Sequence, residues 1–252
     1  MTGFIIFSLI ASTIYIFNDL CDVKEDQKHP IKKYRPIASG KISKKEAVFL
    51  IIILLIPTLI FSFIFFKKFF YIIICYIILN SLYTLKLKHI PILDITIIAF
   101  NFILRILAGA VIINVEISKW IILVTFTLAL FLSLAKRRED ILLTMNGLKV
   151  RKSIKGYNLE LVNSAMSLLG GITIVSYIMY TVSESVQKHF GTDKLYFTAL
   201  FVIIGILRYF QITFVEQNSG DPSKIVLKDK FLQITILLWL LSFYILVKLG
   251  KH

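Results

Sequence analysis

Long apolar stretches recur along the whole chain, and they constrain its fold more than any other feature. Each is about as long as a helix that crosses a hydrocarbon core of about 30 Å. With 57% hydrophobic residues and a mean hydropathy of +0.81, the chain is far more apolar than a soluble domain. The sequence predicts an all-α, polytopic membrane helical bundle in which residues 1–252 form one domain. The eight expected spans are residues 3–17, 46–66, 69–85, 93–113, 118–135, 159–181, 195–214 and 231–249.

Positive charge is distributed unevenly between the two ends of these spans. The net charge is +14, and most Lys and Arg residues lie in the alternate connections 18–45, 86–92, 136–158 and 215–230. Connections rich in Lys and Arg stay in the cytoplasm, so we expect a protein of the cell (inner) membrane with these four connections inside. The charge therefore indicates topology in a bilayer. No nucleic acid partner is expected, because no aromatic-basic pattern for single strands accompanies it.

The first of these connections begins with three aspartates spaced as on one face of a helix. Asp19, Asp22 and Asp26 are three and four residues apart, and Asn18 lies four residues before Asp22. Three carboxylates at the end of a membrane helix repel one another unless a cation lies among them. Mg²⁺ takes oxygen ligands and commonly bridges to substrate phosphates. Two interpretations stay open, a Mg²⁺ site held by the three aspartates and a solvated, capped helix end.

A dense basic segment follows the aspartates directly and contains Lys28, Lys32 and Arg35. A metal site beside several cations suits a diphosphate, because the metal bridges some of its oxygens while Lys and Arg neutralise the others. The same segment is also a signal for the cytoplasmic side, and the two explanations are compatible.

Two arginines lie within apolar spans. Arg105 is the deeper one, and a charged residue at that depth usually faces a bundle interior or a cavity. Substrate binding and a purely structural pairing are equally open for it. For Arg208, near the end of its span, we expect a side chain that extends to the membrane interface.

The residues of the first connection resemble the UbiA superfamily of intramembrane prenyltransferases. The family motif Asn-Asp-x-x-Asp-x-x-x-Asp is matched by Asn18, Asp19, Asp22 and Asp26, and residues 35–40 match the Arg-Pro-x-x-Ser-Gly continuation. The resemblance covers essentially the whole chain and implies a nine-helix bundle with two polar motifs on cytoplasmic connections. We expect eight of the nine helices here, with no counterpart of the family's first helix.

The second family motif, usually Asp-x-x-x-Asp, differs in this chain. Residues 136–140 read Lys-Arg-Arg-Glu-Asp, which is more basic. Together with this departure, four short segments resemble one branch of the family, the decaprenyl-phosphate phosphoribosyltransferases. These segments are residues 29–32, 87–91, 104–109 and 135–137.

That branch implies a Mg²⁺-dependent transfer of a 5-phosphoribosyl group from 5-phosphoribosyl 1-diphosphate to a polyprenyl (decaprenyl) phosphate, a step of cell wall biosynthesis. Diphosphate is released, and Asp19, Asp22 and Asp26 are the implied catalytic metal ligands. The implied substrate ligands are Asn18, Lys28, Lys32, Arg35, Lys86, Lys88, Arg105, Lys136, Arg137, Glu139 and Asp140.

Two other functions remain open on the sequence. One is prenyl transfer from an isoprenyl diphosphate to an aromatic acceptor, which the altered second motif disfavours. The other is transport of a small anion, although transporters place polar residues near the midplane and the charge here gathers at one face. The polyprenyl length and the oligomeric state, a homo-oligomer included, are left open as well.

Overall fold

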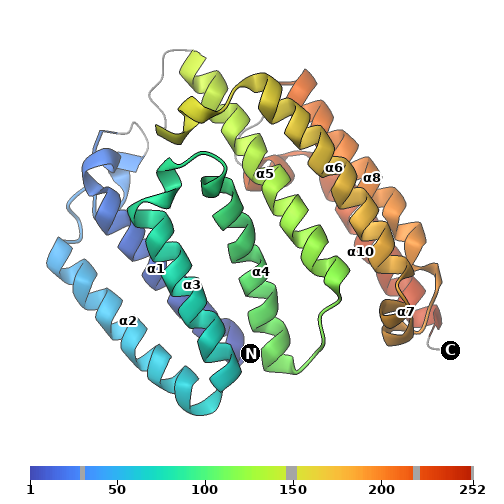
Figure 1. Cartoon of the computed structure of the whole chain (residues 1–252), viewed down its shortest axis with the longest axis horizontal. Coiled ribbons are helices and arrows are strands. Elements are labelled where there is room, and N and C mark those ends of the chain that lie inside the picture. Colours follow the sequence, from blue (N-terminus) through green and yellow to red (C-terminus); the bar gives the residue numbers. More distant parts are fainter. Residues whose placement is uncertain (29–31, 146–151, 218–221, 251–252) are drawn as a thin grey trace. The chain divides into compact units, whose positions relative to one another are not determined.

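The computed structural model describes all residues except 29–31, 146–151, 218–221 and 251–252 (Figure 1). His29 and Pro30, which belong to the branch resemblance, therefore lie outside the described residues. Within the described part the chain is helical throughout, with no strand. The long helices are α1 (Thr2–Asp26), α2 (Lys44–Phe65), α3 (Lys67–Leu85), α4 (Leu93–Ile113), α5 (Lys119–Met145), α6 (Leu159–Val182), α8 (Ala199–Phe210) and α10 (Lys230–Gly250).

Shorter elements join or extend the long helices. They are α7 (Glu184–Phe190), α9 (Pro222–Lys228), the 3-10 turns η1 (Lys32–Tyr34), η2 (Leu87–His89), η3 (Lys152–Gly156) and η4 (Lys194–Thr198), and the π-helical turn η5 (Gln211–Val215).

Eight helical segments in the described residues are long and apolar enough to span a membrane, which confirms the expected all-α membrane bundle. Two helices run further than expected. α1 continues through its aspartates to Asp26, and α5 continues through its basic residues to Met145. The prediction ended both helices where the apolar residues end, but backbone hydrogen bonding continues into the polar segment. Both charged motifs are therefore helical.

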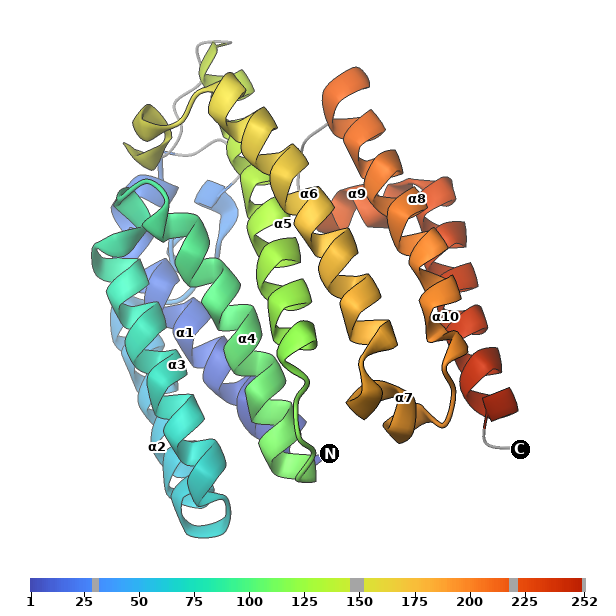
Figure 2. The ribbon, with the colours of Figure 1, turned by 45° about the vertical axis from the view of Figure 1, so that its right-hand side comes forward.

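The chain divides into two compact units, and in the second of them α5 and α6 run side by side (Figure 2). Unit 1 comprises residues 1–97 and 104–116, and unit 2 comprises residues 98–103 and 117–252. The single domain expected from the sequence stays a prediction, and each unit is described by itself.

Unit 1 is built around α1, α3 and α4. Ile6, Ile10 and Ile14 recur every four residues on α1 and pack against Phe69 and Ile73 of α3. α2 begins with a capping box, in which Ser43 and Glu46 satisfy each other's backbone N–H groups at 3.2 and 2.7 Å. This cap ends the basic connection at a defined residue and starts α2 beside α1.

Unit 2 is held by hydrogen bonds between helices as well as by apolar packing. Thr173 of α6 donates to Thr127 of α5 at 2.9 Å, and Trp239 of α10 donates to the Tyr177 hydroxyl at 2.7 Å. The Tyr177 hydroxyl also lies 2.7 Å from the Thr198 hydroxyl. Such bonds join helices in lipid, where apolar surface alone gives little drive for association.

Large apolar side chains remain exposed along α2 and α10, as expected for surfaces that contact lipid. They include Phe49, Ile53, Ile64, Ile234, Leu240 and Ile245.

Gly170 allows a close approach between α6 and α8. A Cβ atom added there would lie 2.8 Å from Cζ of Phe210. The Phe210 ring is itself held against Phe131 and Phe214, with ring centroids 5.4 and 5.2 Å away. The ring therefore has little room to move aside.

We expect Gly170→Ala to destabilise unit 2 by about 1–3 kcal/mol through overpacking. Gly171→Ala is the matched control, because nothing lies within 4 Å of a Cβ at that position and alanine favours a helix. Thermal unfolding of both variants in detergent measures the difference. Equal unfolding midpoints would show that the Gly170–Phe210 contact does not limit packing.

Candidate functional site

The aspartate face of α1, which we define as Asp19, Asp22 and Asp26, is the centre of the candidate site in unit 1. Because α1 is helical through Asp26, the three aspartates lie on one side, as their spacing predicts. Arg35 lies between two of them, and its Nη1 donates to Asp19 Oδ1 at 2.7 Å and to Asp26 Oδ2 at 2.8 Å. Asp26 is buried, with 5% of its side chain exposed, whereas 27% of the Asp19 side chain is exposed.

A second cation reaches the aspartate face from the connection between α3 and α4. Lys88 of η2 forms an ion pair with Asp22 Oδ1, although Lys88 itself is only 8% exposed. Nearby, the Thr84 hydroxyl donates to Asn18 Oδ1 at 3.3 Å. Two connections that are distant in sequence therefore meet the end of α1.

The basic connection is folded back onto α1, which explains the position of Arg35. The Arg35 amide donates to the Lys32 carbonyl at 3.0 Å, and the Ser39 amide donates to the Arg35 carbonyl at 2.8 Å. Gly40 closes this segment with a φ of 78°, a left-handed conformation that glycine adopts without a steric penalty. Below the turn, Ile37 packs with Val23 of α1 in a small buried cluster.

The residues of the aspartate face are suited in part to a divalent ion. Asp19 and Asp26 aim carboxylate oxygens at one shared point, and such oxygens are the ligands that Mg²⁺ prefers. Arg35 lies at that point, and Asp22 is paired with Lys88 instead. Within the described ranges, no three His, Cys, Asp or Glu side chains are grouped as a metal site. The donors thus fit an ion held by one or two carboxylates and completed by phosphates, and the clamp of three aspartates stays a prediction.

The other expected ligands of unit 1 are spread around this centre. Lys28 and Lys86 are exposed, and Lys32 lies on η1 beside Arg35. Arg105 of α4 donates from Nη2 to the Tyr76 hydroxyl at 3.4 Å. This contact ties Arg105 to the core of unit 1, and its role in substrate binding stays a prediction.

Unit 2 contains the second charged motif, on the last turns of α5. Arg137 is 1% exposed and pairs with Asp140 one turn along the helix. Lys136 faces outward, and Glu139 is partly buried. The structure therefore brings Arg137 together with Asp140 and separates Lys136 from both.

Arg138 is a buried residue that was not among the expected ligands. Its Nε donates to Asn163 Oδ1 at 3.0 Å, and its guanidinium lies 5.4 Å from the centre of the Phe214 ring. Helical periodicity could have identified it. The buried positions of α5 include residues 127, 131, 134, 138 and 141, which recur at helical spacing.

Arg208 is held by ion pairs at the end of its helix, and the expectation that it reaches the membrane interface stays a prediction. Its Nη2 pairs with Asp229 Oδ2 at 2.6 Å, and its Nη1 donates to Glu216 at 2.8 Å and to Gln211 at 2.8 Å. The sequence did not predict this pairing, because Asp229 lies 21 residues further along and is brought to α8 by the connection to α10. Arg208 thus ties the C-terminal end of α8 to the start of α10.

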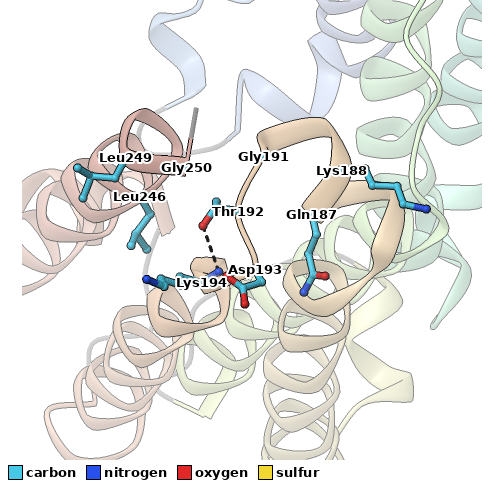
Figure 3. A pocket seen from close by; sticks show the side chains of 9 residues that line it. All are labelled: Gln187, Lys188, Gly191, Thr192, Asp193, Lys194, Leu246, Leu249 and Gly250. Atoms are coloured by element: carbon cyan, nitrogen blue, oxygen red, sulfur yellow. Dashed lines mark hydrogen bonds between the residues drawn. The ribbon is translucent and has the colours of Figure 1, made fainter. Parts of the chain in front are cut away.

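A cavity of about 450 Å³ lies in unit 2 between α7, η4 and the end of α10 (Figure 3). Thr192 lies within it and accepts a hydrogen bond from the Lys194 amide at 3.2 Å. None of the site residues expected from the sequence lines it. The lining residues are Gln187, Lys188, Gly191, Thr192, Asp193, Lys194, Leu246, Leu249 and Gly250.

These observations define a polytopic integral membrane protein with a charged site at the end of its first described helix. Residues 1–232 match the UbiA prenyltransferase family. The chain is 32% identical to a decaprenyl-phosphate phosphoribosyltransferase of Mycolicibacterium smegmatis, over 94% of this chain and 77% of the relative. It is 30% identical to a protein of the same name from Corynebacterium glutamicum, over 94% of this chain and 72% of that one.

A solved structure supports the same fold. A UbiA homolog from Archaeoglobus fulgidus, bound to GPP and Mg²⁺, aligns with a TM-score of 0.71 at 20% identity, over 98% of this chain and 86% of that one. The chain belongs to the UbiA prenyltransferase family, and the resemblance inferred from its first motif is confirmed.

The Arg208–Asp229 pair predicts a pH dependence of stability. Hydrogen bonding from Arg208 lowers the pKa of the Asp229 carboxyl below its ordinary value of 3.8. A carboxyl whose pKa is lower in the folded state stabilises the fold above the unfolded pKa, and this contribution is lost as the pH falls through the folded pKa.

We therefore expect Asp229→Asn to lower the thermal unfolding midpoint in detergent at pH 7 and to reduce its fall as the pH drops below about 4. Asp193→Asn removes an exposed carboxylate from the same unit and is the control. An Asp229→Asn midpoint equal to that of the parent at pH 7 would contradict a stabilising role.

Proposed function

We propose that the chain transfers a 5-phosphoribosyl group from 5-phosphoribosyl 1-diphosphate to a polyprenyl phosphate and releases diphosphate. The observation that carries this proposal is the arrangement of Arg35 and Lys88 on the aspartate face. It gathers carboxylates for a divalent ion and cations for phosphate oxygens at one end of a membrane helix. The names of the relatives from M. smegmatis and C. glutamicum support the phosphoribosyl donor and the decaprenyl phosphate acceptor.

The donor is assigned to the aspartate face because it carries the diphosphate. Asp19 and Asp26 would hold Mg²⁺, with Asp22 as a third ligand if Lys88 moves away. Mg²⁺, when bound, neutralises charge that develops on the departing diphosphate. Arg35, Lys32 and Lys28 donate hydrogen bonds to the remaining phosphate oxygens, and guanidinium groups suit phosphate particularly well because they donate two parallel bonds.

Reaction at the anomeric carbon develops oxocarbenium character, as in glycosyl transfer generally. The residues of the site act by holding the departing diphosphate and by orienting the sugar toward the acceptor. The acceptor phosphate is already anionic, so no strong general base is required. We therefore assign no such role to His89.

The acceptor is assigned to the remaining basic residues. Lys86 of unit 1 and Lys136 of unit 2 are both exposed, and each is by itself a candidate partner for an anionic lipid phosphate. Arg137 is buried against Asp140, so we give it the role of positioning that acidic side chain. The polyprenyl tail would lie along the exposed apolar faces of the helices, and the site would face the cytoplasm at the inner membrane, where a soluble sugar phosphate can enter.

A direct transfer assay tests the proposal. Purified protein in liposomes is incubated with Mg²⁺, decaprenyl phosphate and 5-phosphoribosyl 1-diphosphate labelled in the ribose. We expect label to appear in the lipid fraction. Label that stays in the aqueous fraction, together with transfer from an isoprenyl diphosphate to an aromatic acceptor, would overturn the phosphoribosyl assignment in favour of prenyl transfer. Flux of the labelled anion into protein-containing liposomes without any transfer would favour a transporter.

Asp19→Asn tests the role of the aspartate face with little risk to the fold. The side chain is partly exposed, and Asp26 still holds Arg35 after the change. We expect the transfer rate to fall by about 100-fold or more, the size of effect seen when one stabilising group is removed from an active site. The matched control is Glu25→Gln, which removes an exposed carboxylate of the same helix from outside the aspartate face. Similar rates for the two variants would remove Asp19 from the site.

A further inference from the structure

Each carboxylate of the aspartate face is already paired with a cation of this chain. The Nη1 atom of Arg35 forms ion pairs with both Asp19 and Asp26, and Lys88 forms an ion pair with Asp22. The two cations differ in their freedom to move, since 35% of the Arg35 side chain is exposed but only 11% of the Lys88 side chain.

Arg35 and a divalent ion compete for the same place. Nη1 lies 2.7 and 2.8 Å from the Asp19 and Asp26 oxygens, whereas Mg²⁺ needs oxygens at about 2.0–2.1 Å. An ion between these carboxylates would occupy the space of the guanidinium, and the two positive charges would repel each other at that separation. The ion can therefore be bound there only after Arg35 has moved away.

Arg35 needs a new partner when it leaves, because a partly buried charge without one is costly. A diphosphate supplies such a partner, and it also supplies the oxygens that complete the coordination of the ion. The exposed part of the Arg35 side chain gives it room to turn, whereas the more buried Lys88 has less room to leave Asp22.

We propose that Arg35 is an exchangeable counterion of the aspartate face. A divalent ion and a diphosphate group are then bound together, because each site is completed only when the other ligand is present. On binding, Arg35 moves from Asp19 and Asp26 to the diphosphate, and the ion takes its place. This inference rests on the proposed function only in that the donor carries a diphosphate.

Equilibrium dialysis of the whole protein in detergent, with Mn²⁺ as the probe ion, tests the exchange. Inorganic diphosphate is either absent or present at equal concentration on both sides of the membrane. For the parent protein we expect little excess Mn²⁺ on the protein side without diphosphate and about one ion per chain with it. Mn²⁺ that binds equally tightly in both conditions would overturn the proposal.

Arg35→Gln provides the second arm, because it removes the cation and leaves both carboxylates. We expect this variant to bind Mn²⁺ without diphosphate at least tenfold more tightly than the parent, and Arg35→Lys to lie between the two. Lys33→Gln is the matched control, since Lys33 is an exposed cation of the same turn whose ammonium lies over the Tyr34 ring at 5.1 Å. Equal tightening by Lys33→Gln would show a general effect of charge and contradict the exchange.

Adding Asp19→Asn to Arg35→Gln locates the ion. We expect the double variant to lose the tight Mn²⁺ binding, and retention of that binding would place the ion elsewhere. None of these measurements uses the phosphoribosyl donor or a lipid. A wrong substrate assignment would therefore leave the Mn²⁺ results unchanged, and a failed exchange would leave the transfer assay unaffected.

Discussion

Charge neutralisation at the end of α1 is the interaction on which the site of unit 1 depends. Three carboxylates on one helix face repel one another, and Arg35 and Lys88 compensate this repulsion in the last turns of α1. The compensation also fixes the two connections, since each must fold back to bring its cation to α1. These ion pairs therefore act together with the Ile37–Val23 contact and the backbone hydrogen bonds of the basic connection in shaping the site.

The buried charges of unit 2 are also compensated by neighbouring side chains, but there the contacts stabilise the fold. Arg137 is enclosed with Asp140, and Arg138 is enclosed by Asn163 and the Phe214 ring. Breaking a buried pair leaves an uncompensated charge and is costly, so these contacts hold the ends of α5, α6 and η5 in a defined geometry. In unit 1 the cation between Asp19 and Asp26 remains partly exposed, which suits a group that exchanges partners.

The sequence predicted what depends on local pattern and missed what depends on distant contacts. Apolar length predicted the eight spans, and helical spacing predicted one face for Asp19, Asp22 and Asp26. The pairing of Arg35 with Asp19 joins residues 16 apart, and that of Lys88 with Asp22 joins residues 66 apart. No periodic pattern in the sequence predicts either pairing. The basic residues were therefore predicted to bind phosphate, and their pairing with the aspartates was missed. The pairing of Arg208 with Asp229 was missed for the same reason.

Some of the Lys and Arg residues that count for the positive-inside rule also belong to the candidate site. Lys and Arg in cytoplasmic connections generally set the orientation of membrane spans, and Arg35 and Lys88 belong to two of the connections that the sequence predicts to be cytoplasmic. A topology signal requires only that Lys and Arg lie somewhere in the connection, and their exact positions do not matter. Ion pairs at defined distances to a single helix face require particular positions. A topology signal therefore does not explain the position of Arg35 between Asp19 and Asp26, and this is the part of the basic connection to which we assign ligand binding.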